Sequence, residues 1–120
     1  METMKTENPV ADKSKAFAIA AVRLYQRLVE ERREYVLSKQ FVRSGTSIGA
    51  NVHEAIRAQS HPDFVSKMSI ALKECQETEY WLDLLHETGY VDDTAFHPIQ
   101  RQNKELLRLL TSICKTANAK

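Results

Sequence analysis

A row of polar side chains between residues 43 and 57 has the composition and spacing of a buried polar site. The row comprises Ser44, Ser47, Asn51 and Glu54, with Arg43 and Arg57 at its flanks. Steps of three, four and three residues bring the row to one side of an α-helix. Buried hydroxyl, amide and carboxylate groups need partners, and Glu74 and Glu77 could pair with either arginine. We therefore predict a structural polar network that fixes helix register, and no catalytic residue.

A di-iron centre is the catalytic alternative for such a row. It requires Glu-x-x-His on two helices and two further glutamates. Asp83-x-x-His86 approaches this motif, whereas His53, His61 and His97 are not placed to repeat it. The sequence also has no Gly-rich phosphate loop, nucleophile motif or cysteine cluster. We expect no enzymatic activity, no metal and no cofactor.

A second seam runs along residues 70–88, beside the row expected to face the core. Its members are Ile70, Glu74, Glu77, Trp81, Leu84 and Thr88. A monomeric bundle buries only the core row of this helix and leaves the seam without a packing partner. Aliphatic and aromatic residues aligned with carboxylates suit a subunit contact. We expect Ile70, Trp81 and Leu84 to form an oligomer interface. The alternative is that Trp81 covers the edge of the core and Leu84 is an ordinary exposed leucine.

Basic residues line one face of the last segment of the chain. They are Arg101, Lys104, Arg108 and Lys115, and Arg23 and Arg27 lie one turn apart near the start. In a ring of subunits these faces would form a basic band suited to the phosphate backbones of RNA or DNA. The alternative is a set of solvated helix faces. A net charge of only +1 and the six acidic against two basic residues of positions 61–88 support that alternative.

Four helices must position these residues, and the apolar spacing predicts each of them. We expect helices over about 14–33, from an N-cap at Ser38 to about 58, from Ser60 to a left-handed Gly89, and from a cap at Asp93 or Thr94 onward. Their core rows are Phe17, Ala21, Leu24 and Leu28, widened by Val22, Tyr25 and Val29; Phe41, Gly45, Ile48, Val52 and Ala55; Phe64, Met68, Ala71, Cys75, Thr78, Leu82 and Leu85; and Phe96, Ile99, Leu106, Leu110 and Ile113. Short links make neighbours antiparallel. The predicted fold is all-α, an antiparallel up-down four-helix bundle.

Composition is consistent with one domain. The chain has 120 residues, of which 42% are hydrophobic and 28% charged. We expect residues 1–12 to be a frayed tail and 13–120 to form the bundle. No apolar run reaches the roughly 18 residues of a membrane span, and Met1–Asp12 lacks the core of a signal peptide, so we expect a cytoplasmic protein with no membrane partner. Cys75 and Cys114 are expected to be buried free thiols.

Two longer stretches carry a family resemblance. Residues 40–54 read Gln-Phe-Val-Arg-Ser-Gly-Thr-Ser-Ile-Gly-Ala-Asn-Val-His-Glu, and residues 71–82 read Ala-Leu-Lys-Glu-Cys-Gln-Glu-Thr-Glu-Tyr-Trp-Leu. Together they closely resemble the four-helix-bundle family encoded in intervening sequences of 23S ribosomal RNA genes, over about residues 15–115. This chain has Ala55 where the family usually has Gly.

The resemblance implies an up-down bundle that assembles as a homopentameric ring with no known catalytic activity. It also implies kinship with the accessory protein of diversity-generating retroelements, a basic pentameric barrel that binds nucleic acid and works with a reverse transcriptase. The family motif falls on Arg43, Ser47, Asn51, Glu54, Glu74, Glu77 and Trp81. We therefore expect a homo-oligomeric scaffold or adaptor first, a ring binding RNA or DNA second, and a metal-dependent enzyme last. Beyond a second copy of itself, the sequence identifies no protein partner.

Overall fold

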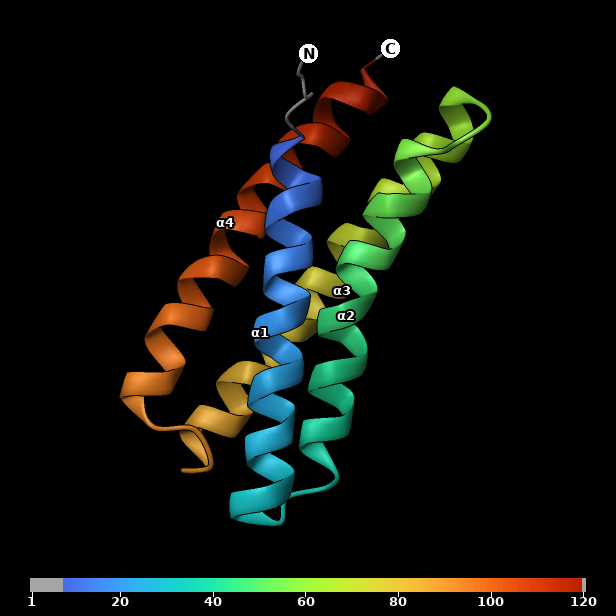
Figure 1. Cartoon of the computed structure of the whole chain (residues 1–120). Helices are drawn as coiled ribbons and strands as arrows, with labels where there is room; N and C mark the ends of the chain where they lie inside the picture. The colour runs from blue at the N-terminus through green and yellow to red at the C-terminus, as the bar shows by residue number, and fades with distance from the viewer. Residues whose placement is uncertain (1–7, 120) are drawn as a thin grey trace, which may run out of the picture.

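The computed structural model describes residues 8–119, which form four α-helices and contain no strand. The helices are α1 (Pro9–Arg32), α2 (Leu37–Ile56), α3 (His61–Glu87) and α4 (Asp93–Asn118). α2 packs between α1 and α3, and α4 contacts α3 and, less extensively, α1 (Figure 1). This arrangement confirms the predicted all-α, antiparallel up-down four-helix bundle. Within the described residues, no helix is both long and apolar enough to cross a membrane.

The first helix begins earlier than predicted. Asn8 caps it, since its side-chain oxygen accepts a hydrogen bond from the backbone N–H of Ala11 at 3.2 Å. Pro9 follows in the first turn, where the missing N–H of a proline costs nothing. The expectation that the tail reaches Asp12 was therefore wrong for Pro9–Asp12, which are helical. The rest of that predicted tail, Met1–Glu7, lies outside the described residues.

The start of α2 depends on Glu34 and not on the predicted N-cap, Ser38. The Glu34 carboxylate accepts hydrogen bonds from the backbone N–H groups of Val36 at 3.1 Å, Leu37 at 3.0 Å and Ser38 at 2.7 Å. A single carboxylate thus satisfies three of the four N–H groups that lack partners at a helix start. Ser38 is buried inside the first turn, where its hydroxyl donates to the backbone oxygen of Glu34 at 2.6 Å.

Of the other three predicted cap and stop positions, two are confirmed. The Ser60 hydroxyl accepts from the N–H of Asp63 at 3.2 Å at the start of α3. After α3, Gly89 adopts a left-handed φ of 87°. The cap of α4 was misplaced by one or two residues. Asp92, and neither Asp93 nor Thr94, accepts from the N–H of Ala95 at 2.9 Å.

The predicted core rows meet in the centre of the bundle. All of these residues are buried except Tyr25, Val29, Phe64 and Ile113, which are half-buried, and Val22, which is 38% exposed. The expectation that Val22 widens the core row of α1 was therefore wrong. Gly45 brings α2 close to α1, because a methyl group added there would lie 3.1 Å from the Cβ of Ala21. Close packing of this kind resists enlargement of the residue.

One buried polar residue of α4 had not been predicted. Asn103 replaces an apolar residue in the core row, and its side-chain amide donates to the backbone oxygen of Cys75 at 3.3 Å. The thiol of Cys75 also lies 3.6 Å from the backbone oxygen of Asn103. These contacts join α3 to α4. Cys75 and Cys114 are buried free thiols as predicted, and burial raises the pKa of Cys75 to about 12.

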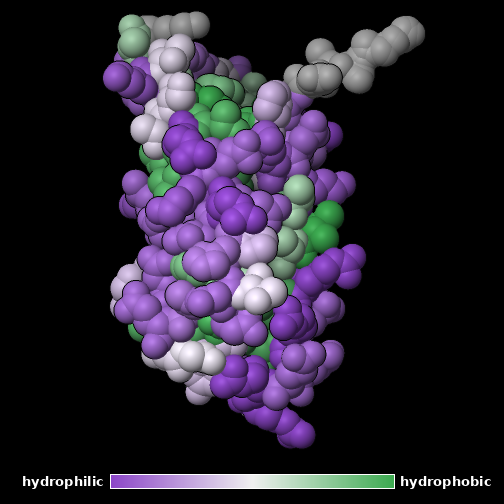
Figure 2. All heavy atoms as spheres, turned by 90° about the vertical axis from the view of Figure 1, so that its left-hand side faces the viewer, coloured by the Kyte–Doolittle hydropathy of each residue, from purple (hydrophilic) through white to green (hydrophobic). Residues whose placement is uncertain are grey.

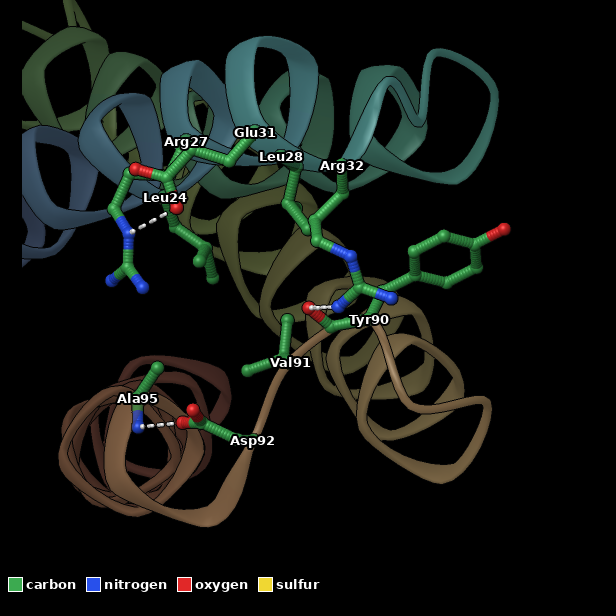
Figure 3. Close-up of a pocket in the computed structure, with 9 residues that line it drawn as sticks. All are labelled: Leu24, Arg27, Leu28, Glu31, Arg32, Tyr90, Val91, Asp92 and Ala95. Carbon is green, nitrogen blue, oxygen red and sulfur yellow. Dashed lines mark hydrogen bonds and ion pairs between the residues drawn. The ribbon is translucent and has the colours of Figure 1, made fainter.

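The end of α1 is fastened to the loop between α3 and α4. One guanidinium nitrogen of Arg32 donates to the backbone oxygens of Gly89 and Tyr90, both at 3.0 Å. The same guanidinium lies 5.0 Å from the centre of the Tyr90 ring, within range of a cation–π interaction. A pocket of about 150 Å³ beside this contact is lined by Leu28, Val91 and Ala95 among others (Figure 3).

Glu34 provides a test of how α2 begins. Burial alone would raise the pKa of its carboxyl, but hydrogen bonds from Leu37, Ser38 and Val36 together outweigh burial and lower that pKa. Its stabilisation is therefore present above the unfolded pKa of about 4.3 and lost as the pH falls through the lower folded value. At pH 7, Glu34→Gln should decrease the free energy of unfolding by about 1–3 kcal/mol.

Urea denaturation of the wild type and Glu34→Gln at pH 7 and near pH 3 measures this effect. The difference between the two proteins should shrink at the lower pH. Glu30→Gln is the control, because Glu30 is an exposed glutamate of α1. A difference that stays constant or grows on acidification contradicts the proposed role of the Glu34 carboxylate.

Candidate oligomer interface

The two rows singled out by the sequence lie on the same side of the bundle, where α2 packs against α3. An ion pair of 3.7 Å between the Glu54 carboxylate and the Lys67 ammonium crosses between the helices on this side. Arg43 lies near enough to Glu74 for its charge to act on the carboxyl group. We call this surface the α2–α3 face. It contains the polar row of α2 and the second seam of α3.

The polar row of α2 does not close into a network within one chain. The Ser47 hydroxyl donates to the backbone oxygen of Arg43 at 2.8 Å, and the Asn51 amide donates to that of Ser47 at 2.9 Å. Both bonds stay inside α2. In the described part of the chain, no side-chain hydrogen bond or ion pair joins Arg43 to Glu74 or Glu77, and Arg57 is exposed at the end of α2. The polar row therefore retains hydrogen-bonding capacity toward solvent or another molecule.

A different polar contact is buried between these helices. The hydroxyls of Ser44 and Thr78 lie 2.9 Å apart, and each residue is almost fully buried. The Thr78 hydroxyl is also 2.7 Å from the backbone oxygen of Glu74, and the Ser44 hydroxyl is 3.2 Å from that of Phe41. The polar register contact between α2 and α3 is therefore this pair of hydroxyls.

Carboxylates border the α3 side of the face. Partial burial raises the pKa of Glu74, the neighbouring charge of Glu77 raises it further, and Arg43 and Lys73 act in the opposite direction. Glu77 is exposed and accepts a hydrogen bond from the indole N–H of Trp81 at 3.1 Å. These two glutamates give the face an acidic edge.

Four apolar or aromatic side chains lie toward the outer surface of α3. Ile70 is 39% exposed, Trp81 and Leu84 are half-buried, and Tyr80, which had not been predicted as part of this site, is 60% exposed. The Tyr80 and Trp81 rings meet edge to face with centres 5.1 Å apart. We call Ile70, Tyr80, Trp81 and Leu84 the α3 apolar row. The spacing did contain a signal for Tyr80, which lies three residues after Glu77 and four before Leu84.

The predicted basic residues occupy the other side of the molecule, on the outer surfaces of α1 and α4. All six are exposed, and the side of α4 seen in Figure 2 is covered mostly by hydrophilic side chains. Lys104 lies 3.4 Å from Glu79, and Arg27 lies 4.0 Å from Glu31. Among the described residues, no carboxylate lies within 4.0 Å of the other four, which are Arg23, Arg101, Arg108 and Lys115.

Within residues 8–119, no group of three or more His, Cys, Asp or Glu side chains is placed to hold a metal ion. His86 instead contacts Asp93 at 2.7 Å and stacks on Phe96 with ring centres 3.8 Å apart.

Comparison with known proteins places these observations in context. A family model described as 23S rRNA-intervening sequence protein matches residues 6–112. A solved structure from Bacteroides thetaiotaomicron, described as a protein with unknown function from the S23 ribosomal protein family, is 53% identical in sequence. The match covers 88% of this chain and 98% of the Bacteroides chain, with a TM-score of 0.86. No curated protein matches the chain.

The buried hydroxyl pair predicts which polar residues of this face stabilise a single chain. Thr78→Val keeps the shape of the side chain and removes the hydroxyl, so it should decrease the free energy of unfolding by about 1 kcal/mol. Ser47→Ala, which removes a half-exposed hydroxyl bonded to its own helix, should cost less. Thermal denaturation of both variants tests this order, and a larger loss for Ser47→Ala contradicts it.

Proposed function

The chain belongs to the 23S rRNA-intervening sequence protein family, and from this premise we propose that it is a non-enzymatic, cytoplasmic, homo-oligomeric scaffold or adaptor. The observation that carries this proposal is the α3 apolar row, in which a single bundle leaves Ile70 and Tyr80 exposed and covers Trp81 and Leu84 only in part. The row has aromatic side chains at its centre and carboxylates at its edge, and subunit contacts commonly combine an apolar centre with a polar rim in this way. The polar row of α2 adds hydrogen-bonding groups beside it.

We propose five subunits arranged in a ring, the number that the family resemblance implies. A cyclic ring needs a head-to-tail contact between two different surfaces of each subunit. The α2–α3 face supplies one of these surfaces.

A second candidate function is binding to the phosphate backbone of RNA or DNA. It is favoured by the exposed basic residues of α4 and α1, which a ring would repeat around its axis. The near-neutral total charge and the pairing of Lys104 with Glu79 weaken the case, so we rank it second.

Assembly is the first test. The wild type should sediment as an oligomer at micromolar concentration, and Trp81→Ala should weaken assembly, because removing a central aromatic often costs about 2 kcal/mol of contact energy. Tyr35→Ala is the matched control, since Tyr35 is an exposed aromatic in the loop between α1 and α2. Circular dichroism confirms that each variant is folded. A wild type that sediments as a stable monomer contradicts the proposed oligomer.

Nucleic-acid binding has a separate test. Fluorescent structured RNA and duplex DNA are titrated with the protein at low and physiological salt. If the second function holds, binding should be steeply salt-dependent, with little sequence preference, and Arg101→Glu combined with Arg108→Glu should abolish it. Arg33→Glu combined with Lys39→Glu, at exposed positions outside both basic faces, is the matched control. Absence of binding at low salt, or binding that the Arg101 and Arg108 reversal leaves unchanged, rejects this function.

A further inference from the structure

A second uncovered apolar surface lies on α1. Ile19 is 48% exposed and Val22 is 38% exposed, and Ala18 lies beside them. Two basic side chains, Lys15 and Arg23, border these three residues along the same hollow in the surface, which has a volume of about 390 Å³. We call Ala18, Ile19 and Val22 the α1 patch.

The α1 patch continues into a groove between α1 and α2. Lys15 and Ala18 line both the patch and this groove, which has a volume of about 450 Å³. On the α2 side the groove is lined by Thr46, Gly49, Ala50, Val52 and His53. A Cβ added to Gly49 would lie 3.3 Å from the backbone oxygen of Ser14, so the glycine lets α1 approach α2 closely. The patch therefore opens onto a shallow surface that a protruding side chain can enter.

The arrangement of the helices gives the two apolar surfaces different directions. The backbone of α2 runs beside those of both α1 and α3, whereas α1 and α3 have no Cα atoms within 8 Å of each other. The groove places the α1 patch on the α1–α2 side, and the α3 apolar row belongs to the α2–α3 face. Two different contact surfaces that flank the same helix meet at an angle, and repeated head-to-tail contacts between such surfaces close into a ring when the rotation fits.

Carboxylates at the edge of one surface can meet cations at the edge of the other. Glu74 and Glu77 border the α3 apolar row, with Arg43 and Lys73 near Glu74, and Lys15 and Arg23 border the α1 patch. Opposite charges favour the joining of these two surfaces. A symmetric contact between two α3 rows would instead bring the glutamates of one subunit toward those of the other, which is unfavourable.

We propose that the α1 patch binds the α3 apolar row of a second copy of this chain. This contact rests on the proposed oligomer and specifies which second surface of the subunit completes it. The aromatic side chains of one subunit cover Ile19 and Val22 of the next, and Lys15 and Arg23 lie against the acidic edge formed by Glu74 and Glu77.

Two variants that each damage one side of the contact provide the test. Ile19→Asp introduces a charge into the α1 patch and leaves the α3 apolar row intact. Trp81→Asp introduces a charge into the α3 apolar row and leaves the α1 patch intact. Each variant alone should sediment as a monomer at 10 µM, roughly the concentration at which a micromolar contact forms. An equimolar mixture should contain a 1:1 heterodimer at higher concentration, because one undamaged contact remains between the two variants.

Ile56→Asp is the matched control, since Ile56 on α2 is an isoleucine of 46% exposure outside both surfaces. It should assemble like the wild type, and circular dichroism should show native helix content for all three variants. A wild-type oligomer that Ile19→Asp leaves intact, or a mixture that remains monomeric, overturns this contact while the oligomer stands. A wild type that is itself monomeric overturns the oligomer and the contact together.

Discussion

Each helix of a four-helix bundle can bury only one side in the single core. Apolar residues on the other side of a helix therefore stay exposed unless another molecule covers them. α3 fills its inward side with Met68, Ala71, Cys75, Leu82 and Leu85 and still carries apolar residues on its outer side. α1 does the same on a smaller scale with Ile19 and Val22. Burying these outer surfaces requires another molecule, because no further helix within residues 8–119 is left to cover them. The fold and the proposed assembly thus follow from the same limit.

α2 determines how the two uncovered surfaces are related. Its small residues let α1 pack closely, with Gly45 against Ala21 and Gly49 against Ser14, and its buried hydroxyl at Ser44 meets Thr78 of α3. These contacts hold α1 and α3 on opposite flanks of one helix. The outer polar groups of α2 mostly bond to their own backbone, as Ser47 and Asn51 do. α2 therefore fixes the angle between the two surfaces and leaves the apolar contact area to its neighbours.

Sequence periodicity predicted the core well because apolar spacing reports directly on which side of a helix is buried. Periodicity did not predict a polar residue that occupies a core position, nor a side chain that caps a helix from the preceding turn. Asn103 occupies a core position that an apolar pattern skips, and its partner is a backbone oxygen of α3. Glu34 lies before α2, in the turn after α1, and reaches three N–H groups through a side-chain conformation that spacing does not encode.

For the candidate site, spacing predicted which residues form each row on its helix. Whether Arg43 reaches Glu74 or Glu77 depends on side-chain torsions, which spacing does not give. Tyr80 lies at steps of three and four from Glu77 and Leu84, but the heptad-spaced seam of residues 70–88 passes through Trp81 between these two positions.

The acidic residues of α3 lie on two sides of the helix, one toward α4 and one toward α2. Their positions bear on which of the two proposed functions is ranked first. On the side toward α4, Glu79 pairs with Lys104, and burial raises the pKa of Asp83, with Glu79 and Glu87 raising it further and Lys104 opposing them. These carboxylates reduce the positive potential of the α4 face within the chain itself. On the side toward α2, Glu74 and Glu77 have no ion-pair partner among the described residues. The charge of α3 therefore weakens the basic surface that phosphate backbones would use and leaves an acidic edge beside the apolar row. Both effects favour contact with another protein subunit over contact with nucleic acid, which is why the scaffold is the first proposal.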